Sequence, residues 1–192
     1  MTDQPHAAPR FKPLQLDQMT PEQRRTAEQI LAGPRKSLLG PFNALLRSPE
    51  LGDRIQAVGA YVRFQNTIPE KLKELAILVV ARHWTAQFEW YAHRQFALAA
   101  GLDTEICDAI AAGQRPQRLA ADEAEVYDFC TSLLATGKVT DAQFNAVRDR
   151  FGERGVLDLV GTVGYYCTVS LILNVDRYPL PAVATPLADL KT

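Results

Sequence analysis

The stretch IPEKLKELAILVVARHWTAQFEWYAHRQFALAAGL, residues 68–102, decides the class of fold. Pro69 favours a helix start, because the first helical turn does not use the N–H group that proline lacks. The run LAILVVA that follows is apolar on all sides, which is typical of a helix buried in a core. A second segment with helical spacing ends at Gly101, a residue common just after helices. We therefore predict two consecutive helices, the first of them deeply buried.

Helix signals of the same kind recur along the rest of the chain. Thr20, Asp103 and Thr140 stand where side chains cap helix N-termini. Ser48 precedes Pro49 in the same way. The segments expected to be helical are 20–33, 42–47, 48–66, 68–84, 86–101, a short one from 103, 120–137, 140–152 and about 153–175. No segment shows the sustained alternation of a strand, so we predict an all-α fold.

Length and composition fit one helical domain over residues 1–192, with enough apolar residues (47%) for a sizeable core. An extended N-terminal segment, 1–18, and a proline-rich tail, 176–192, flank the helices. The stretches 68–102 and 140–175 both run from a capped start into a Glu-bearing apolar helix. This similarity suggests a domain built from two similar helical halves.

The charge pattern argues against a nucleic-acid partner, because 21 basic and 22 acidic side chains are spread along the chain without a basic block. The N-terminus has no apolar run of the kind found in signal peptides. Residues 155–175 are long and apolar but include Asp158, and an Asp at mid-bilayer costs about 2.5–3.5 kcal/mol. We interpret this segment as a core or subunit-interface helix, and we expect a cytoplasmic protein without a membrane partner.

Three cysteines, Cys107, Cys130 and Cys167, are widely spaced. There is no CxxC and no Cys/His cluster with the spacing of metal ligands. The pattern indicates buried, reduced thiols. We expect no metal and no cofactor.

Glu89 and His93 are the first candidates for chemistry, because residues i and i+4 of a helix meet on one face. A carboxylate in partly apolar surroundings would raise the pKa of the imidazole and orient its ring, as general acid/base catalysis requires. The alternative is an ordinary surface ion pair. Glu74 lies in the most apolar helix, where a buried carboxylate needs a partner; alternatively, it is a first-turn Glu favoured by the helix dipole.

Residues 70–102 resemble the characteristic block of the carboxymuconolactone decarboxylase family, which also contains alkylhydroperoxidase D. The peroxidase branch has a Glu, eleven residues, a Cys, two residues, a second Cys, three residues and a His. Glu74 and His93 stand at that spacing, with Ala86 and Glu89 at the two cysteine positions. The sequence EWYAH matches the decarboxylase-like branch, in which Glu-Trp-x-x-His is usual.

The resemblance implies an orthogonal all-α bundle of the alkylhydroperoxidase D type, assembled into homo-oligomers such as trimers or hexamers, with the catalytic block over 69–113. Peroxide reduction needs an attacking thiolate and a resolving thiol. Because Ala86 and Glu89 can be neither, peroxidase activity is not expected. The resemblance instead implies cofactor-free acid/base chemistry, with His93 as proton donor or charge stabiliser, Glu89 as its orienting partner and Glu74 as a second carboxylate.

The substrate that the resemblance implies is a small carboxylated or lactone-bearing metabolite of aromatic catabolism, so a cationic anchor is expected. Arg63 and Arg82 suit a carboxylate, since arginine binds it through two parallel hydrogen bonds. The alternative for each is a structural ion pair. A structural ion pair is the favoured interpretation of Arg94, which lies off the Glu89/His93 face.

Aromatic residues provide candidate walls for a substrate pocket. Trp84, Trp90 and Tyr91 could surround a small ring, although such residues more often belong to a core or a subunit interface. The segment LLGPFNALL, 38–46, with Phe42, is either a pocket edge or an interhelix turn.

Three functions remain open at this level. The leading one is a lyase of the carboxymuconolactone decarboxylase type. A lactone hydrolase or an isomerase could use the same residues, because spacing does not fix the reaction. The third is a non-catalytic, oligomeric small-molecule-binding protein in which Glu74, Glu89 and His93 form a buried structural network.

Overall fold

The computed structural model describes residues 8–190, which form helices and no strand. The predicted all-α class is confirmed. The elements are η1 (Leu16–Gln18, a 3-10 helix), α1 (Pro21–Ala32), α2 (Phe42–Leu45), α3 (Pro49–Phe64), α4 (Glu70–His83), α5 (Gln87–Ala99), α6 (Thr104–Ala111), α7 (Ala121–Thr136) and α8 (Asp141–Asp176).

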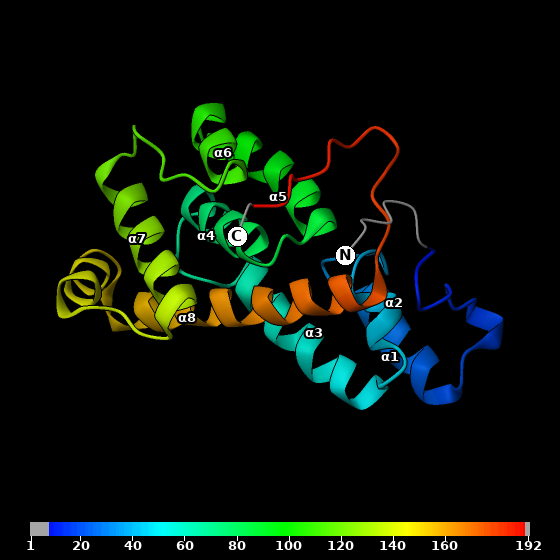
Figure 1. Ribbon diagram of the computed structural model, residues 1–192. Coiled ribbons are helices and arrows are strands. Elements are labelled where there is room, and N and C mark those ends of the chain that lie inside the picture. Colours follow the sequence, from blue (N-terminus) through cyan, green and yellow to red (C-terminus); the bar gives the residue numbers. More distant parts are fainter. Residues whose placement is uncertain (1–7, 191–192) are drawn as a thin grey trace.

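The helices are arranged around α8, which runs through the molecule (Figure 1). The N-terminal helices α1, α2 and α3 lie on one side of α8, and α4, α5 and α6 lie on the other. Helix α4 occupies the centre, in contact with α5, α6, α7 and α8. Helix α5, which carries the Glu-Trp-x-x-His sequence, contacts both α4 and α8.

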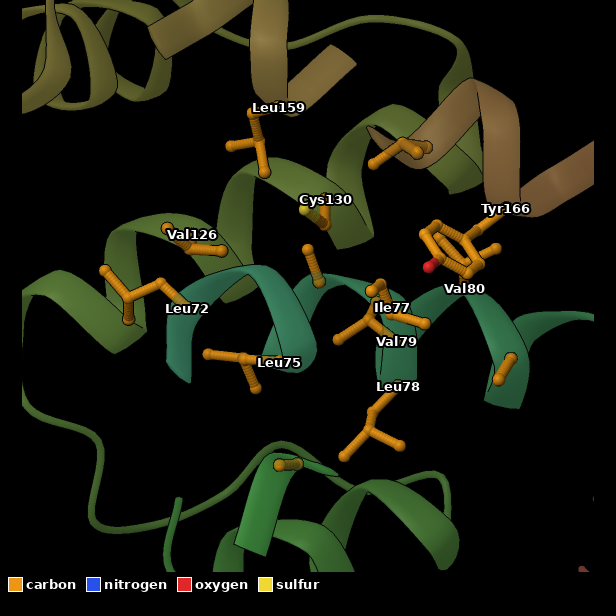
Figure 2. Packing of buried hydrophobic residues seen from close by; sticks show 14 of the residues in the cluster. Leu72, Leu75, Ile77, Leu78, Val79, Val80, Val126, Cys130, Leu159 and Tyr166 are labelled. Carbon is orange, nitrogen blue, oxygen red and sulfur yellow. The ribbon is translucent and has the colours of Figure 1, made fainter. Parts of the chain in front are cut away.

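Helix α4 is central because its sequence has no polar face. Every residue from Leu72 to Arg82 is buried. Its apolar side chains point outward in all directions and meet Val126 and Cys130 of α7 and Leu159 and Tyr166 of α8 (Figure 2). Since burying one large aliphatic side chain stabilises a fold by about 1.5–3 kcal/mol, this helix anchors the core.

Three of the four predicted side-chain caps are present. Thr20 and Thr140 each accept a hydrogen bond from the backbone of the third helical residue, and Asp103 caps α6. Ser48 is an exception, because it stands at the N-cap of α3 but its side chain makes no capping hydrogen bond.

Helix α8 contains the break that the sequence predicted at Gly152. That residue has φ +72°, a left-handed conformation that glycine adopts without steric cost. By length and composition α8 could cross a membrane, yet 56% of its most apolar 18-residue window is buried inside the protein. Asp158 accepts hydrogen bonds from the Tyr61 hydroxyl and from the Thr67 backbone and hydroxyl groups, so this carboxylate ties α8 to the end of α3.

Both ends of the described chain pack against helices. Residues 8–15 are non-helical, but the predicted extended segment 1–18 also contains η1, and residues 1–7 lie outside the described part. The backbone N–H of Phe11 donates to Asp176 at the end of α8. In the C-terminal tail, Leu187 exchanges two hydrogen bonds with the side chain of Gln87 on α5, and the tail passes beside this helix (Figure 1).

Candidate active site

Glu74 is the buried centre of the site. It lies in the second turn of α4 and is 0% exposed, so the interpretation as a first-turn Glu is wrong. Its Oε2 lies 2.6 Å from Nδ1 of His93, and its Oε1 lies 3.0 Å from Nη1 of Arg63 on α3. A carboxylate this deep in the core needs such partners, because an unpaired buried charge is strongly unfavourable.

His93 lies between two carboxylates. Its Nδ1 forms the hydrogen bond with Glu74, and its Nε2 lies 2.9 Å from Oε1 of Glu89, one turn earlier on α5. His93 is 6% exposed and Glu89 4%, so the interpretation as an ordinary surface ion pair is wrong. Because Glu74 accepts from Nδ1, the ring is oriented with Nε2 on the Glu89 side.

The carboxylates determine the protonation state of the imidazole. Burial lowers the pKa of His93, but the charge of Glu89 and the hydrogen bonds with Glu74 and Glu89 outweigh it and raise this pKa to about 8. For Glu74, burial acts in the opposite direction and raises the pKa. The hydrogen bond and charge of His93, together with the charge of Arg63, outweigh burial and bring the pKa of Glu74 below its ordinary value. At neutral pH the favoured state is therefore an imidazolium between two carboxylates.

Arg63 completes this cluster from α3. Its guanidinium pairs with Glu74, approaches Nδ1 of His93 at 3.5 Å and stacks over the ring of Phe96 at 4.4 Å. The Lys73 ammonium donates to the Arg63 backbone carbonyl and holds this end of α3 in place. Arg63 thus forms the structural ion pair expected as one alternative, and it also lines the cavity beside His93.

A cavity of about 330 Å³ adjoins the cluster. Its charged lining consists of Glu89, His93, Arg63 and Arg35. Its other walls are mainly aromatic and are contributed by Phe42, Phe64, Phe88, Phe96, Tyr165 and Tyr166. The segment 39–42 forms one edge, so the structure places Phe42 where the pocket-edge interpretation expected it; its role in binding remains a prediction.

Two of the residues considered for substrate binding lie elsewhere. Arg82 donates to the carbonyls of Ala111 and Ala188 and to the Thr85 hydroxyl, and so joins α6 to the C-terminal tail. Trp84 donates from Nε1 to the sulfur of Cys167. Neither lines the cavity that contains His93. They were assigned to the site because they are close to the motif in sequence. At the end of α4, however, Arg82 contacts α6 and the C-terminal tail, and Trp84 contacts Cys167 of α8.

Arg94 forms the ion pair expected of it, with Nη2 2.9 Å from Asp108. The other two aromatic candidates also stay out of the cavity. Trp90 is buried in the core, and Tyr91 does not line the cavity.

Among the cavity residues that sequence reasoning missed are Tyr166, Tyr165 and Arg35. Tyr166 places its ring edge-on against His93, with centroids 4.9 Å apart, and burial raises the pKa of its phenol. Tyr165 accepts a hydrogen bond from Arg35. The adjacent tyrosines in an otherwise aliphatic helix were a usable signal, since buried phenols need polar partners. Arg35 lies in the α1–α2 connection, where no motif marks it.

The cysteines are separate from the site. Cys107 and Cys130 are buried in the core, and burial raises the pKa of the Cys107 thiol to about 11 and that of Cys130 further. No cysteine lines the cavity. Between residues 8 and 190, no group of three or more His, Cys, Asp or Glu side chains is arranged to hold a metal ion.

These features define an all-α protein in which a carboxylate–imidazole–carboxylate cluster borders an aromatic cavity. No protein-family model matches the sequence, and no curated protein matches it. The structure is similar to the crystal structure of an alkylhydroperoxidase D core, an uncharacterised peroxidase-related protein from Ralstonia eutropha JMP134. The two share 14% sequence identity with a TM-score of 0.72, over 92% of this chain and 94% of the other. The chain therefore has the alkylhydroperoxidase D-like fold.

Proposed function

We propose that this protein is a cofactor-independent acid/base enzyme of the carboxymuconolactone decarboxylase type, acting on a small carboxylated or lactone-bearing metabolite. The observation that carries the proposal is His93, held between Glu74 and Glu89 at the wall of a cavity large enough for a small ring. A pKa of about 8 gives His93 a proton to deliver at neutral pH.

In such a decarboxylation, the bond between a carbon and its carboxylate breaks and CO2 leaves. The electron pair passes through the conjugated system to the lactone carbonyl oxygen, and a proton then adds to carbon. The His93 imidazolium beside the cavity would stabilise the negative charge and donate the proton from Nε2. Glu89 lines the cavity and contacts Nε2 of His93, so it would orient the imidazole ring and, after each reaction, transfer a proton from solvent back to Nε2.

Peroxidase chemistry is not proposed, although the similar solved structure is described as peroxidase-related. Ala86 offers no nucleophile, and Glu89 offers a carboxylate where a resolving thiol would be needed. The buried thiols with raised pKa values are poor nucleophiles as well.

Mass spectrometry of purified protein with a panel of unsaturated lactones and β-carboxylated acids tests the proposal. Loss of CO2 by the native protein, abolished in Glu89→Gln and retained in Arg118→Gln, would support the lyase. A gain of water would identify a hydrolase using the same residues, and a product of unchanged mass would identify an isomerase. No conversion, with no ligand-induced rise in melting temperature, would contradict the enzyme and favour a binding protein.

We also propose that the protein is a homo-oligomer that associates through α8. Exposed apolar side chains follow one face of this helix: Leu157, Val160, Leu171 and Val175. A side chain added at Gly161 or Gly164, between them, would meet no other atom. A face of this size without a charge is more typical of a subunit interface than of a solvated surface.

A further inference from the structure

Arg35 lines the cavity, and among residues 8–190 it has no carboxylate as a counterion. It lies in the loop that joins α1 to α2, far in sequence from the block 69–113. Its Nη2 donates to the Tyr165 hydroxyl at 3.3 Å, while its Nε is buried without a hydrogen-bond partner. In the described part of the chain its guanidinium pairs with no carboxylate.

The two other arginines considered for the site have acceptors that Arg35 lacks. Arg63 pairs with Glu74. Arg82 donates to two backbone carbonyls and a hydroxyl, although its Nε, like that of Arg35, is buried without a hydrogen-bond partner. Arg35 instead packs its guanidinium over the ring of Phe42 at 4.9 Å and near that of Phe64 at 5.9 Å. A buried donor without an acceptor costs about 1–3 kcal/mol, so a group that remains unpaired calls for a functional explanation.

The backbone around Arg35 is shaped to hold this arrangement. A Cβ atom at Gly59 on α3 would lie 2.2 Å from the Tyr165 hydroxyl oxygen and 2.5 Å from Nη2 of Arg35, so only glycine leaves room for the pair. Lys36, the next residue in the loop, has φ +52°, which costs a non-glycine residue about 1–2 kcal/mol. Such strain persists only where the surrounding structure maintains it, as it often does at ligand clamps.

We infer that Arg35 is the residue that binds the carboxylate of the substrate, and that it fixes the substrate against the aromatic walls with its reacting carbon toward His93. Arg35 and His93 both line the cavity, so one small molecule can contact both. The inference takes this cavity as the substrate site, and in that it rests on the proposed function.

A monoanionic carboxylate suits the site better than a phosphate. The guanidinium offers one uncompensated positive charge and a fork of donors that matches two carboxylate oxygens. Glu89 is already paired with the His93 imidazolium, so the single unpaired charge of Arg35 matches one negative charge better than two. The aromatic walls favour an unsaturated or ring-shaped body attached to the carboxylate.

Calorimetric titration of the full-length protein with benzoate, phenyl phosphate and neutral benzyl alcohol tests the inference. We expect native protein to bind benzoate most tightly and Arg35→Gln to bind it about 10- to 100-fold more weakly, as for a lost charged hydrogen bond. Benzyl alcohol should bind both proteins alike. Arg118→Gln, which removes an exposed arginine outside the cavity, is the matched control and should bind benzoate as the native protein does.

Two further variants keep the test decisive if Arg35→Gln folds poorly. Arg35→Lys retains the charge without the fork and should give an intermediate affinity. Gly59→Ala leaves every charge in place but displaces the Arg35–Tyr165 pair, so it should weaken benzoate binding as well. Equal benzoate affinity in native and Arg35→Gln proteins, no saturable benzoate binding by native protein, or a preference for phenyl phosphate would each overturn the inference.

Binding and turnover separate this inference from the proposed function. Arg35-dependent benzoate binding without conversion of any acid in the panel would leave the carboxylate site standing and reject the enzyme. Conversion of an acid in the panel, with the same KM in the native and Arg35→Gln proteins, would support the enzyme and reject Arg35 as the carboxylate-binding residue.

Discussion

Nδ1 of His93 lies 2.6 Å from Oε2 of Glu74, and this contact joins α5 to α4 across nineteen residues of sequence. The carboxylate is fully buried, and its other oxygen is paired with Arg63. The contact therefore orients the imidazole and at the same time satisfies a charge in the core. Both consequences can be measured separately.

The stability of the protein should fall as the pH rises through about 8. The folded-state pKa of His93, about 8, exceeds its usual value of 6.5. The stabilisation is therefore fully present below about pH 6.5 and is lost as the imidazolium deprotonates near pH 8. A shift of this size corresponds to roughly 2 kcal/mol. Urea unfolding between pH 6 and pH 9 measures it, and His93→Gln should remove the decline; an equally steep decline in that variant would assign it to other groups.

Glu74→Gln should lower the pKa of His93. The substitution keeps the shape of the side chain, but it removes a negative charge and replaces the carboxylate that accepts from Nδ1 with a neutral amide. The lowering of the pKa by burial is then less strongly opposed. NMR titration of the imidazole resonances gives the pKa directly. His83, which lies outside the cluster, provides an internal reference and should titrate unchanged. An unaltered His93 pKa would mean that Glu89 alone sets it.

Replacing His93 should abolish turnover while the fold is kept. His93→Ala is the simple test, and His93→Gln is the milder one because its amide can still contact a carboxylate. Arg63 remains beside Glu74 in both, so the buried carboxylate keeps a partner. Circular dichroism checks the helices and a product assay checks activity. Turnover in a folded His93→Ala protein would reject the acid/base model.

The thiols should not support peroxide reduction. Cys107 and Cys130 are buried with raised pKa values, so their thiolate forms are scarce at neutral pH. We expect both to resist a thiol-reactive dye until the protein is unfolded, and hydroperoxide to be consumed no faster than in buffer. Rapid consumption, lost on alkylation of the thiols, would contradict this expectation.

A charge on the exposed face of α8 should dissociate the oligomer. Leu157 is 71% exposed in the single chain, and Leu157→Glu would place a carboxylate at the proposed interface at little cost to the monomer. Light scattering after size exclusion gives the mass. Val183→Glu, at an exposed position in the C-terminal tail, is the control and should leave the mass unchanged. A native protein that is monomeric at all concentrations would reject the interface.

The sequence by itself predicted the elements that depend on local chemistry. Thr20, Asp103 and Thr140 marked helix starts because capping is a bond between neighbours in the chain. Gly152 marked a break because only glycine adopts its φ without cost. Glu89 and His93 met as predicted, since one helical turn brings i and i+4 together.

The tertiary structure decided what surrounds that pair. Whether Glu89 and His93 face solvent or the core depends on the packing of α5 against α4 and α8, which no local rule specifies. Arg82 and Trp84 stand near the motif in sequence but point away from the cavity. Arg35 and Tyr165, 130 residues apart, line it together. Helical spacing fixes neighbours within a few residues, whereas a binding site is made where distant helices meet, and the burial of their apolar faces selects that meeting.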